Sequence, residues 1–461
     1  MAMKNELVMA LGMVLAGCVP QSHKILSEDD AGAGETPTEW VELAGAGRQH
    51  FGESLAWGDL DADGLDDIIL VERSFGSILI LYGRPIRLTG THALAAADVE
   101  ILGPMHDIGS MWVDVGDFDG DGVDDLLVGA AQETIHVLYG GARWSGTPAI
   151  GTLGPTFTQG SVPFGGWVRS AGDVDADGCD DFLVPRPDRG AYLVYGQSER
   201  WSGNAVFTPD ATIAGTGDIS EFCLGRAGDL DGDGFADLLI GERNLIDVQG
   251  HSILHLGIFY GSADLMGALS IDDADATVEI PNAACSPSGG FNLNGDGFAD
   301  FVAATTWSDS TVYVFLGGPV RLAGAQPAAG AAAFTLTGAH ADDQLGSAVS
   351  AGDFDGNGND DLLIGSPGYF GTSSRALGRA YRVSTLYSGS IVDADEIWEG
   401  RIRSTPTLLP EPDHVYAERL GSVVAQDGDF DGDGHADALL GAPSDLIPFG
   451  GQVVRLVYGE P

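Results

Sequence analysis

The chain has 461 residues, 44% of them apolar and 69 of them glycine, and a formal net charge of −47. This composition is typical of short strands joined by tight turns, and it argues against both disorder and long helices. So large a negative charge excludes a nucleic-acid-binding protein, which needs a clustered basic surface. We expect positively charged partners instead, with metal ions as a major part of them.

The first 17 residues predict an export signal. Lys4 precedes a ten-residue apolar run at 7–16, which is too short to span a membrane as a helix of about 20 residues. The following Leu15-Ala-Gly-Cys18 resembles the lipobox of bacterial lipoproteins, in which the cysteine is lipidated and becomes the mature N-terminus; an ordinary signal peptide is the alternative. We therefore expect a lipid at Cys18, a flexible tether over 18–38, and anchoring at the bacterial outer membrane or cell surface.

Seven copies of one acidic loop occupy the rest of the chain. In the clearest copy, Asp229 to Asp237, aspartates stand at positions 1, 3, 5 and 9, and a glycine at position 6 permits a tight turn. Oxygen ligands in this pattern suit a hard divalent cation. Because the loop recurs, the sequence indicates a repeat protein that forms one closed unit over 39–461. Loops one to seven begin at Asp59, Asp117, Asp173, Asp229, Asn292, Asp353 and Asp429.

Each repeat predicts four strands. A short strand opened by Phe-Gly or Leu-Gly, as at Phe51-Gly52, precedes the loop, and an apolar run such as Ile68–Val71 follows it. A third strand ends in Tyr-Gly, as in Ser77–Gly83, and a fourth, more polar one such as Val99–Leu102 is expected at the outer edge. Seven such units predict an all-β fold, a seven-bladed β-propeller of four-stranded blades.

The two ends of the repeat region predict how the ring closes. Only two strands follow loop seven, whereas an unpaired candidate strand, Glu39–Leu43, precedes loop one. We expect this N-terminal strand to join the last blade, because closure between the chain ends removes a free sheet edge.

The Phe-Gly pairs, the Asp-x-Asp-x-Asp-Gly-x-x-Asp loops and triplets such as Gly441-Ala442-Pro443 resemble the FG-GAP repeats of the integrin α-subunit propeller. The resemblance covers about residues 39–461. It implies a β-hairpin calcium loop whose ligands are the side chains at positions 1, 3, 5 and 9 and the carbonyl at position 7. An EF-hand is excluded because position 12 is apolar in all seven copies, whereas an EF-hand carries a glutamate there.

We expect up to seven structural Ca²⁺ ions, bound with a Kd on the order of 10⁻⁴ to 10⁻³ M. The implied ligand residues are Asp59, Asp61, Asp63, Leu65, Asp67, Asp117, Asp119, Asp121, Val123, Asp125, Asp173, Asp175, Asp177, Cys179, Asp181, Asp229, Asp231, Asp233, Phe235, Asp237, Asn292, Asn294, Asp296, Phe298, Asp300, Asp353, Asp355, Asn357, Asn359, Asp361, Asp429, Asp431, Asp433, His435 and Asp437.

The integrin resemblance also implies that a ligand binds the propeller face opposite the calcium loops. Three connections on that face are long: Glu242–Ser252, Ser366–Arg379 and Pro443–Gly450. The leading hypothesis is a surface-anchored adhesion module with a monomeric head and an extracellular protein or matrix ligand. Candidate contacts are Arg73, Phe75, Arg243, Trp307, Tyr369 and Phe370.

Two other functions are alternatives to adhesion. A carbohydrate-binding lectin is the alternative, because similar seven-bladed propellers bind sugars. A polysaccharide-degrading enzyme is less well supported, since the sequence has neither a G-x-S-x-G elbow nor an H-E-x-x-H pair. We expect no enzymatic activity and no catalytic residues.

One further motif, Arg-Trp-Ser-Gly, recurs after the third strand at Arg143–Gly146 and Arg200–Gly203. Trp144 and Trp201 could stack on sugars, but repetition in register favours a local packing turn.

The cysteines do not determine a disulfide pattern. Cys223 and Cys285 precede loops four and five on neighbouring blades and could pair in an oxidising compartment, while Cys179 lies within loop three.

Overall fold

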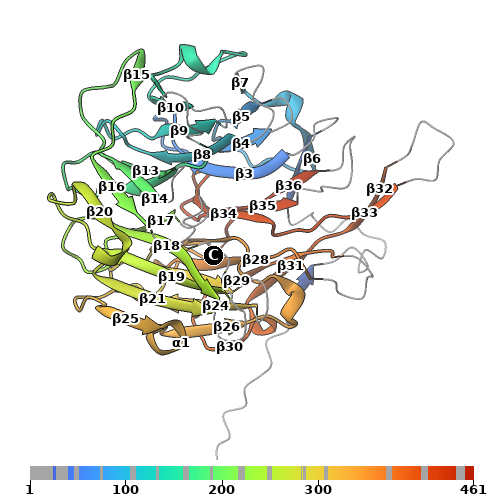
Figure 1. Ribbon diagram of the computed structural model, residues 1–461. Coiled ribbons are helices and arrows are strands. Elements are labelled where there is room, and N and C mark those ends of the chain that lie inside the picture. Colours follow the sequence, from blue (N-terminus) through green and yellow to red (C-terminus); the bar gives the residue numbers. More distant parts are fainter. Residues whose placement is uncertain are drawn as a thin grey trace, which may run out of the picture.

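Seven β-sheets surround a common axis in the computed structural model (Figure 1). The structure describes residues 24–26, 40–45, 51–72, 76–103, 111–130, 134–158, 166–186, 190–215, 224–246, 252–281, 283, 287–305, 310–369, 376–405, 414–442 and 452–460. The predicted all-β, seven-bladed propeller is therefore confirmed.

Each blade has four antiparallel strands, ordered from the axis to the rim. In blade one these are β3 (Phe51–Gly58), β4 (Asp67–Glu72), β5 (Ser77–Leu81) and β7 (Val99–Leu102). Blade two contains β8 (Met111–Gly116), β9 (Asp125–Ala130), β10 (Thr134–Leu138) and β11 (Thr156–Thr158), and blade three contains β12 (Arg169–Gly172), β13 (Asp181–Arg186), β14 (Gly190–Val194) and β16 (Ala211–Ala214). Blade four contains β17 (Leu224–Gly228), β18 (Asp237–Ile246), β19 (Ser252–Phe259) and β21 (Ala276–Pro281), and blade five contains β22 (Ser288–Phe291), β23 (Asp300–Thr305), β24 (Thr311–Phe315) and β26 (Phe334–Thr337). Blade six contains β27 (Val349–Gly352), β28 (Asp361–Ser366), β29 (Arg379–Val383) and β31 (Glu396–Glu399), and blade seven contains β34 (Val423–Gly428), β35 (Asp437–Ala442), β36 (Val453–Val457) and β2 (Val41–Ala44).

The second strand of each blade carries most of the core. β4 is buried along its whole length, and Ile68 to Val71 have no exposed surface. A continuous apolar run is required here because both faces of the strand pack against neighbouring blades. The innermost strands contact one another in a complete ring, from β3 through β8, β12, β17, β22 and β27 to β34 and back to β3.

The N-terminal strand closes the ring, as the sequence predicts. β2 pairs antiparallel with β36, with Val41 opposite Leu456 and Leu43 opposite Val454. Leu43 is fully buried in this seam. The last blade is thus completed by residues from both ends of the repeat region.

In every blade except blade one, the fourth strand differs from the sequence expectation because it is not the edge of its sheet. In six sheets a short fifth strand pairs with it in parallel, so the backbone groups that would be exposed at the rim gain partners. In five of these sheets the added strand comes from the segment after the third strand of the next blade. The fifth strands are β6 (Thr91–Ala93) on β2, β15 (Asn204–Val206) on β11, β20 (Gly267–Ser270) on β16, β25 (Gly324–Pro327) on β21, β30 (Gly389–Ser390) on β26 and β1 (Lys24–Leu26) on β31.

The connections contain short helical turns and one separate hairpin. The hairpin of β32 (Ile402–Thr405) and β33 (His414–Ala417) lies between blades six and seven and projects from the propeller in Figure 1. The turns are η2 (Leu94–Ala96), η3 (Ile150–Thr152), η5 (Ile271–Asp273), α1 (Ala328–Ala331), η6 (Ala341–Asp343) and η7 (Ile391–Asp393). Among the residues that the structure describes, no helix is long and apolar enough to cross a membrane.

The expected long loop at Glu242–Ser252 is largely a strand extension. β18 continues to Ile246 and pairs with β19 from Ser252, because Arg243 and Asn244 find register partners in Leu254 and Ile253. This hairpin therefore extends beyond the length of the corresponding strands in the other blades.

Candidate calcium sites and the axial channel

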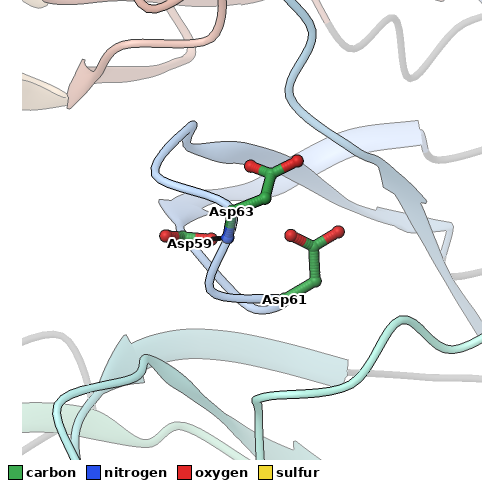
Figure 2. Close-up of side chains that lie close together, drawn as sticks. All are labelled: Asp59, Asp61 and Asp63. Atoms are coloured by element: carbon green, nitrogen blue, oxygen red, sulfur yellow. Dashed lines mark hydrogen bonds between the residues drawn. The ribbon is translucent and has the colours of Figure 1, made fainter.

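The seven acidic loops lie between the first and second strands of their blades, where the chain reverses direction. In loop one, the Asp59 carboxylate accepts hydrogen bonds from the backbone N–H groups of Asp63 at 3.0 Å and Gly64 at 2.8 Å. Gly64 has φ +85°, a left-handed conformation that favours glycine. Figure 2 shows the side chains of Asp59, Asp61 and Asp63 extending from this one tight turn.

The aspartate at position 9 connects each loop to the rest of its blade. The Asp67 carboxylate accepts from the Leu60 N–H at 3.0 Å and from the Gly83 N–H at 2.9 Å. Gly83 belongs to the Tyr-Gly pair that ends the third strand, and a Cβ there would lie 2.5 Å from the Leu65 side chain. The recurring glycine is therefore explained by close packing of the loop on the third strand.

Burial raises the pKa of these position-9 carboxyls. The pKa of Asp67, Asp125, Asp181 and Asp437 is raised to about 8, and that of Asp237 to about 7, mainly by loss of hydration; neighbouring loop carboxylates raise it further. Backbone N–H donors oppose this rise without cancelling it. A bound cation would favour the ionised carboxylates and offset the desolvation.

Five of the loops bring three carboxylates close enough to share one ion. In loops one, two, three, four and seven, one oxygen from each of three aspartates lies within 4.8 Å of the others. In loop one the Asp61 Oδ1 atom is buried and has no hydrogen-bond partner, which fits a metal ligand. These clusters are consistent with Ca²⁺, which prefers carboxylate and carbonyl oxygens.

Loops five and six are not among the five clusters. Loop five has Asn292 and Asn294 at two ligand positions. In loop six, Arg382 of the same blade donates to Asp361 at 3.1 Å and lies over the Phe354 ring, 4.9 Å from its centroid. For these two loops, calcium binding stays a prediction.

Four arginines bind neighbouring acidic loops, and two of them, Arg143 and Arg200, belong to the turn that the sequence predicted only to pack locally. Arg143 of blade two pairs with Asp61 and with Asp63 of loop one, the second pair at 2.6 Å. The two turns that contain Trp144 and Trp201 therefore also connect neighbouring blades, in addition to packing locally. The sequence signal for this contact was the recurrence of arginine one residue before Trp or Leu in Arg87, Arg143, Arg200 and Arg321.

A second missed feature is the aspartate at position 8 of some loops. The Asp124 carboxylate of loop two accepts from the Asp59 N–H of loop one at 3.0 Å, and Asp66 does the same for Asp429 at 2.8 Å. These contacts join consecutive loops around the axis. The side chains line an axial channel of about 800 Å³.

The opposite mouth of this channel is aromatic. Trp112, at the start of β8, stacks on Trp167 with ring centroids 3.3 Å apart, and Glu53 and Arg169 line the channel nearby. Trp112, Glu53 and Arg169 lie at or near the starts of the inner strands β8, β3 and β12, and Trp167 just precedes β12. All four therefore lie at the end of the channel away from the acidic loops.

Most of the ligand-face candidates lie outside the described residues. These are Arg73, Phe75, Trp307 and Phe370, and the lipidation candidate Cys18 and the cysteines Cys223 and Cys285 also lie outside them. Arg243 is in β18, but its side chain is not described. Tyr369 is partly buried, with the Arg379 guanidinium over its ring at 3.5 Å. Cys179 is a buried free thiol.

The metal-free protein should lose stability as the pH rises from about 4 to about 8. The position-9 carboxyls bind protons in the folded state across this window, whereas an unfolded aspartate has already released its proton; the free energy of unfolding therefore falls with rising pH. We expect a lower urea midpoint at pH 8.5 than at pH 5.5 for protein freed of metal on a chelating resin.

The control for this experiment is the same pair of measurements with 5 mM CaCl₂, in which the midpoint should not fall between pH 5.5 and 8.5. Buried His136, with a pKa lowered by burial to about 4, opposes the trend as a single group. A metal-free midpoint that rises with pH would contradict the assignment.

Comparisons with known proteins agree with this geometry. Residues 111–146 and 345–385 match the FG-GAP repeat, and residues 59–128 match an FG-GAP-like repeat. The chain is 26% identical over 223 residues to integrin alpha-5 of Xenopus laevis, a match that covers 45% of this chain and 21% of that protein. It is 34% identical over 147 residues to integrin alpha-IIb of Homo sapiens, covering 28% and 14% respectively.

The chain matches about a fifth or less of the length of these relatives. A crystal structure of BBS1N in complex with ARL6DN covers 92% of this chain and 98% of that one, with a TM-score of 0.48 and 10% identity, which is too distant to support an argument. Fold, loops and repeats together define an integrin α-like FG-GAP propeller with calcium-loop-like acidic clusters. Domains of this class are typically non-enzymatic binding modules.

Proposed function

We propose that this protein is a calcium-stabilised, surface-anchored binding module that engages an extracellular protein or matrix ligand. The observation that carries the calcium assignment is the set of five carboxylate clusters. In one of them the buried Asp61 Oδ1 atom has no hydrogen-bond partner. Calcium at these loops pins the first hairpin of each blade, and the rigid propeller then presents its other face. The proposed anchor is a lipid on Cys18, at the bacterial outer membrane or cell surface.

The proposed ligand face is the one opposite the acidic loops, around the Trp112 and Trp167 pair. Both tryptophans are half-buried in the lining of the channel, and tryptophan supplies a large contact area at a small cost in conformational entropy. Glu53 and Arg169 add charges of both signs to this mouth of the channel. This combination suits a protein ligand, in which apolar and charged groups alternate.

The test is binding of the purified full chain to arrays of extracellular-matrix proteins and of glycans, in 2 mM CaCl₂. We expect a protein hit that weakens at least tenfold in a Trp112→Ala, Trp167→Ala variant. The matched control is Trp144→Ala, which removes an indole near the acidic loops and should leave binding unchanged. A glycan hit alone would favour the lectin alternative, and equal binding by all three proteins would contradict the proposed face.

A further inference from the structure

The same arginine contact occurs at four of the seven acidic loops, and each time it crosses from one blade to its neighbour. Blades two, three, five and one supply the arginine to loops one, two, four and seven respectively. It pairs with the Oδ2 atoms of positions 3 and 5 of the loop. The pairs are Arg143 with Asp61 and Asp63, Arg200 with Asp119 and Asp121, Arg321 with Asp231 and Asp233, and Arg87 with Asp431 and Asp433.

Each of these arginines is held in place by a tyrosine of the blade that it contacts. The Arg143 guanidinium lies 4.7 Å from the centroid of the Tyr82 ring, and the Tyr82 hydroxyl accepts the N–H of Trp144 at 2.7 Å. The other three arginines stack in the same way at 4.5 to 4.7 Å. Cation–π contact and two ion pairs fix the cation beside the loop.

Loop three lacks this contact and serves as a natural comparison. The Tyr82 hydroxyl donates to the Trp144 carbonyl at 3.2 Å, and the Tyr195 hydroxyl donates to the Leu265 carbonyl at 2.7 Å. Leu265 therefore takes the place of Trp144, and Asp264, one residue earlier, takes that of Arg143. In the described part of the chain, no arginine pairs with Asp175 or Asp177 of loop three.

We propose that the four arginines are built-in counter-ions, which hold the loops and blades together without calcium and weaken calcium binding at loops one, two, four and seven. Loop three, with an aspartate in place of the arginine, then fills first. This inference rests on the proposed calcium binding. The calcium affinity would then differ from loop to loop around the ring instead of being equal at all loops.

The two charges oppose each other because they share the same carboxylates. An ion on the Oδ1 atoms and a guanidinium on the Oδ2 atoms lie about 5 to 6 Å apart, given metal–oxygen distances of roughly 2.4 Å. The Arg143 side chain is 53% exposed, so a water-like dielectric applies. Repulsion between charges of +2 and +1 then lowers the calcium affinity roughly tenfold, about 1.4 kcal/mol.

The first test is calcium titration of the full chain by isothermal calorimetry, compared with Asp264→Arg and Arg143→Gln. The wild-type protein should show one tighter site, which Asp264→Arg weakens roughly tenfold. Arg143→Gln should enlarge the tighter class from one site to two. Arg84→Gln is the matched control, because Arg84 lies in the same turn as Arg87 but pairs with Asp98 at 2.6 Å.

The second readout separates a counter-ion from an arginine that merely orients the calcium ligands. A counter-ion predicts that Arg143→Gln lowers the melting temperature in chelator and yet increases the calcium-induced rise. An orienting arginine would lower both. Weaker or unchanged calcium binding in Arg143→Gln would overturn the inference, whereas absence of calcium binding in every variant would overturn the proposed calcium sites as well.

Discussion

Removing calcium should lower the melting temperature of the propeller by roughly 5 to 15 °C. At 5 mM calcium and a Kd of 10⁻⁴ to 10⁻³ M, each site contributes about 1 to 2.3 kcal/mol, so five clusters contribute about 5 to 12 kcal/mol. A chain of this size melts with an entropy that converts about 1 kcal/mol into a little over 1 °C. Differential scanning calorimetry in 5 mM CaCl₂ and in EGTA measures the difference.

Two controls accompany this measurement. Magnesium in place of calcium should restore little stability, because Mg²⁺ demands a tighter octahedral arrangement. In a variant with Asp61→Asn and Asp231→Asn, calcium should raise the melting temperature by less than in the wild-type protein. The melting temperature should still be higher in CaCl₂ than in EGTA. Coincident melting curves with and without calcium would show that the loops do not bind it at this concentration.

Removing the closing strand should be the most damaging change at the ends of the repeat region. A chain that begins at residue 46 lacks β2, whereas one that begins at residue 40 keeps it. The loss exposes the edge of β36 and removes the buried side chains of Val41 and Leu43, each contributing about 1.5 to 3 kcal/mol. We expect the free energy of unfolding to fall by at least about 3 kcal/mol, and the shorter chain to aggregate.

A point substitution tests the same seam without a truncation. Leu43→Ala should cost about 2 to 5 kcal/mol, because Leu43 is fully buried between β36 and the neighbouring blade. Leu102→Ala is the matched control, since Leu102 is 41% exposed and should change stability by less than about 0.5 kcal/mol. Equal urea midpoints for the two variants would contradict a closing role for β2.

The β32–β33 hairpin could not be predicted from the repeat pattern. The interval between the starts of the sixth and seventh loops, Asp353 and Asp429, is the longest in the chain, and a four-strand repeat predicts no strand for its extra residues. The structure places residues 402–405 and 414–417 in a separate two-stranded sheet. An insertion has no counterpart in the other repeats, so no pattern in the sequence fixes its pairing.

The strand pattern could be read from the sequence because it is local and repeated. Val99–Leu102, which the sequence predicts as a fourth strand from its composition, forms β7 with the same bounds. The acidic loops could also be predicted from the sequence, because their pattern of carboxylates and glycine is contained in nine consecutive residues.

The sequence by itself determined the number of blades, the strand order, the pattern of carboxylates in the loops and the closing role of the segment before loop one, since each depends on spacing along one stretch of chain. Only the tertiary structure decided the fifth strands at the rim, the axial channel and the arginine contacts. Arg143 lies about 80 residues from the aspartates that it binds. Such contacts depend on the orientation of one blade relative to the next. This orientation results from packing across the whole ring rather than from any local motif.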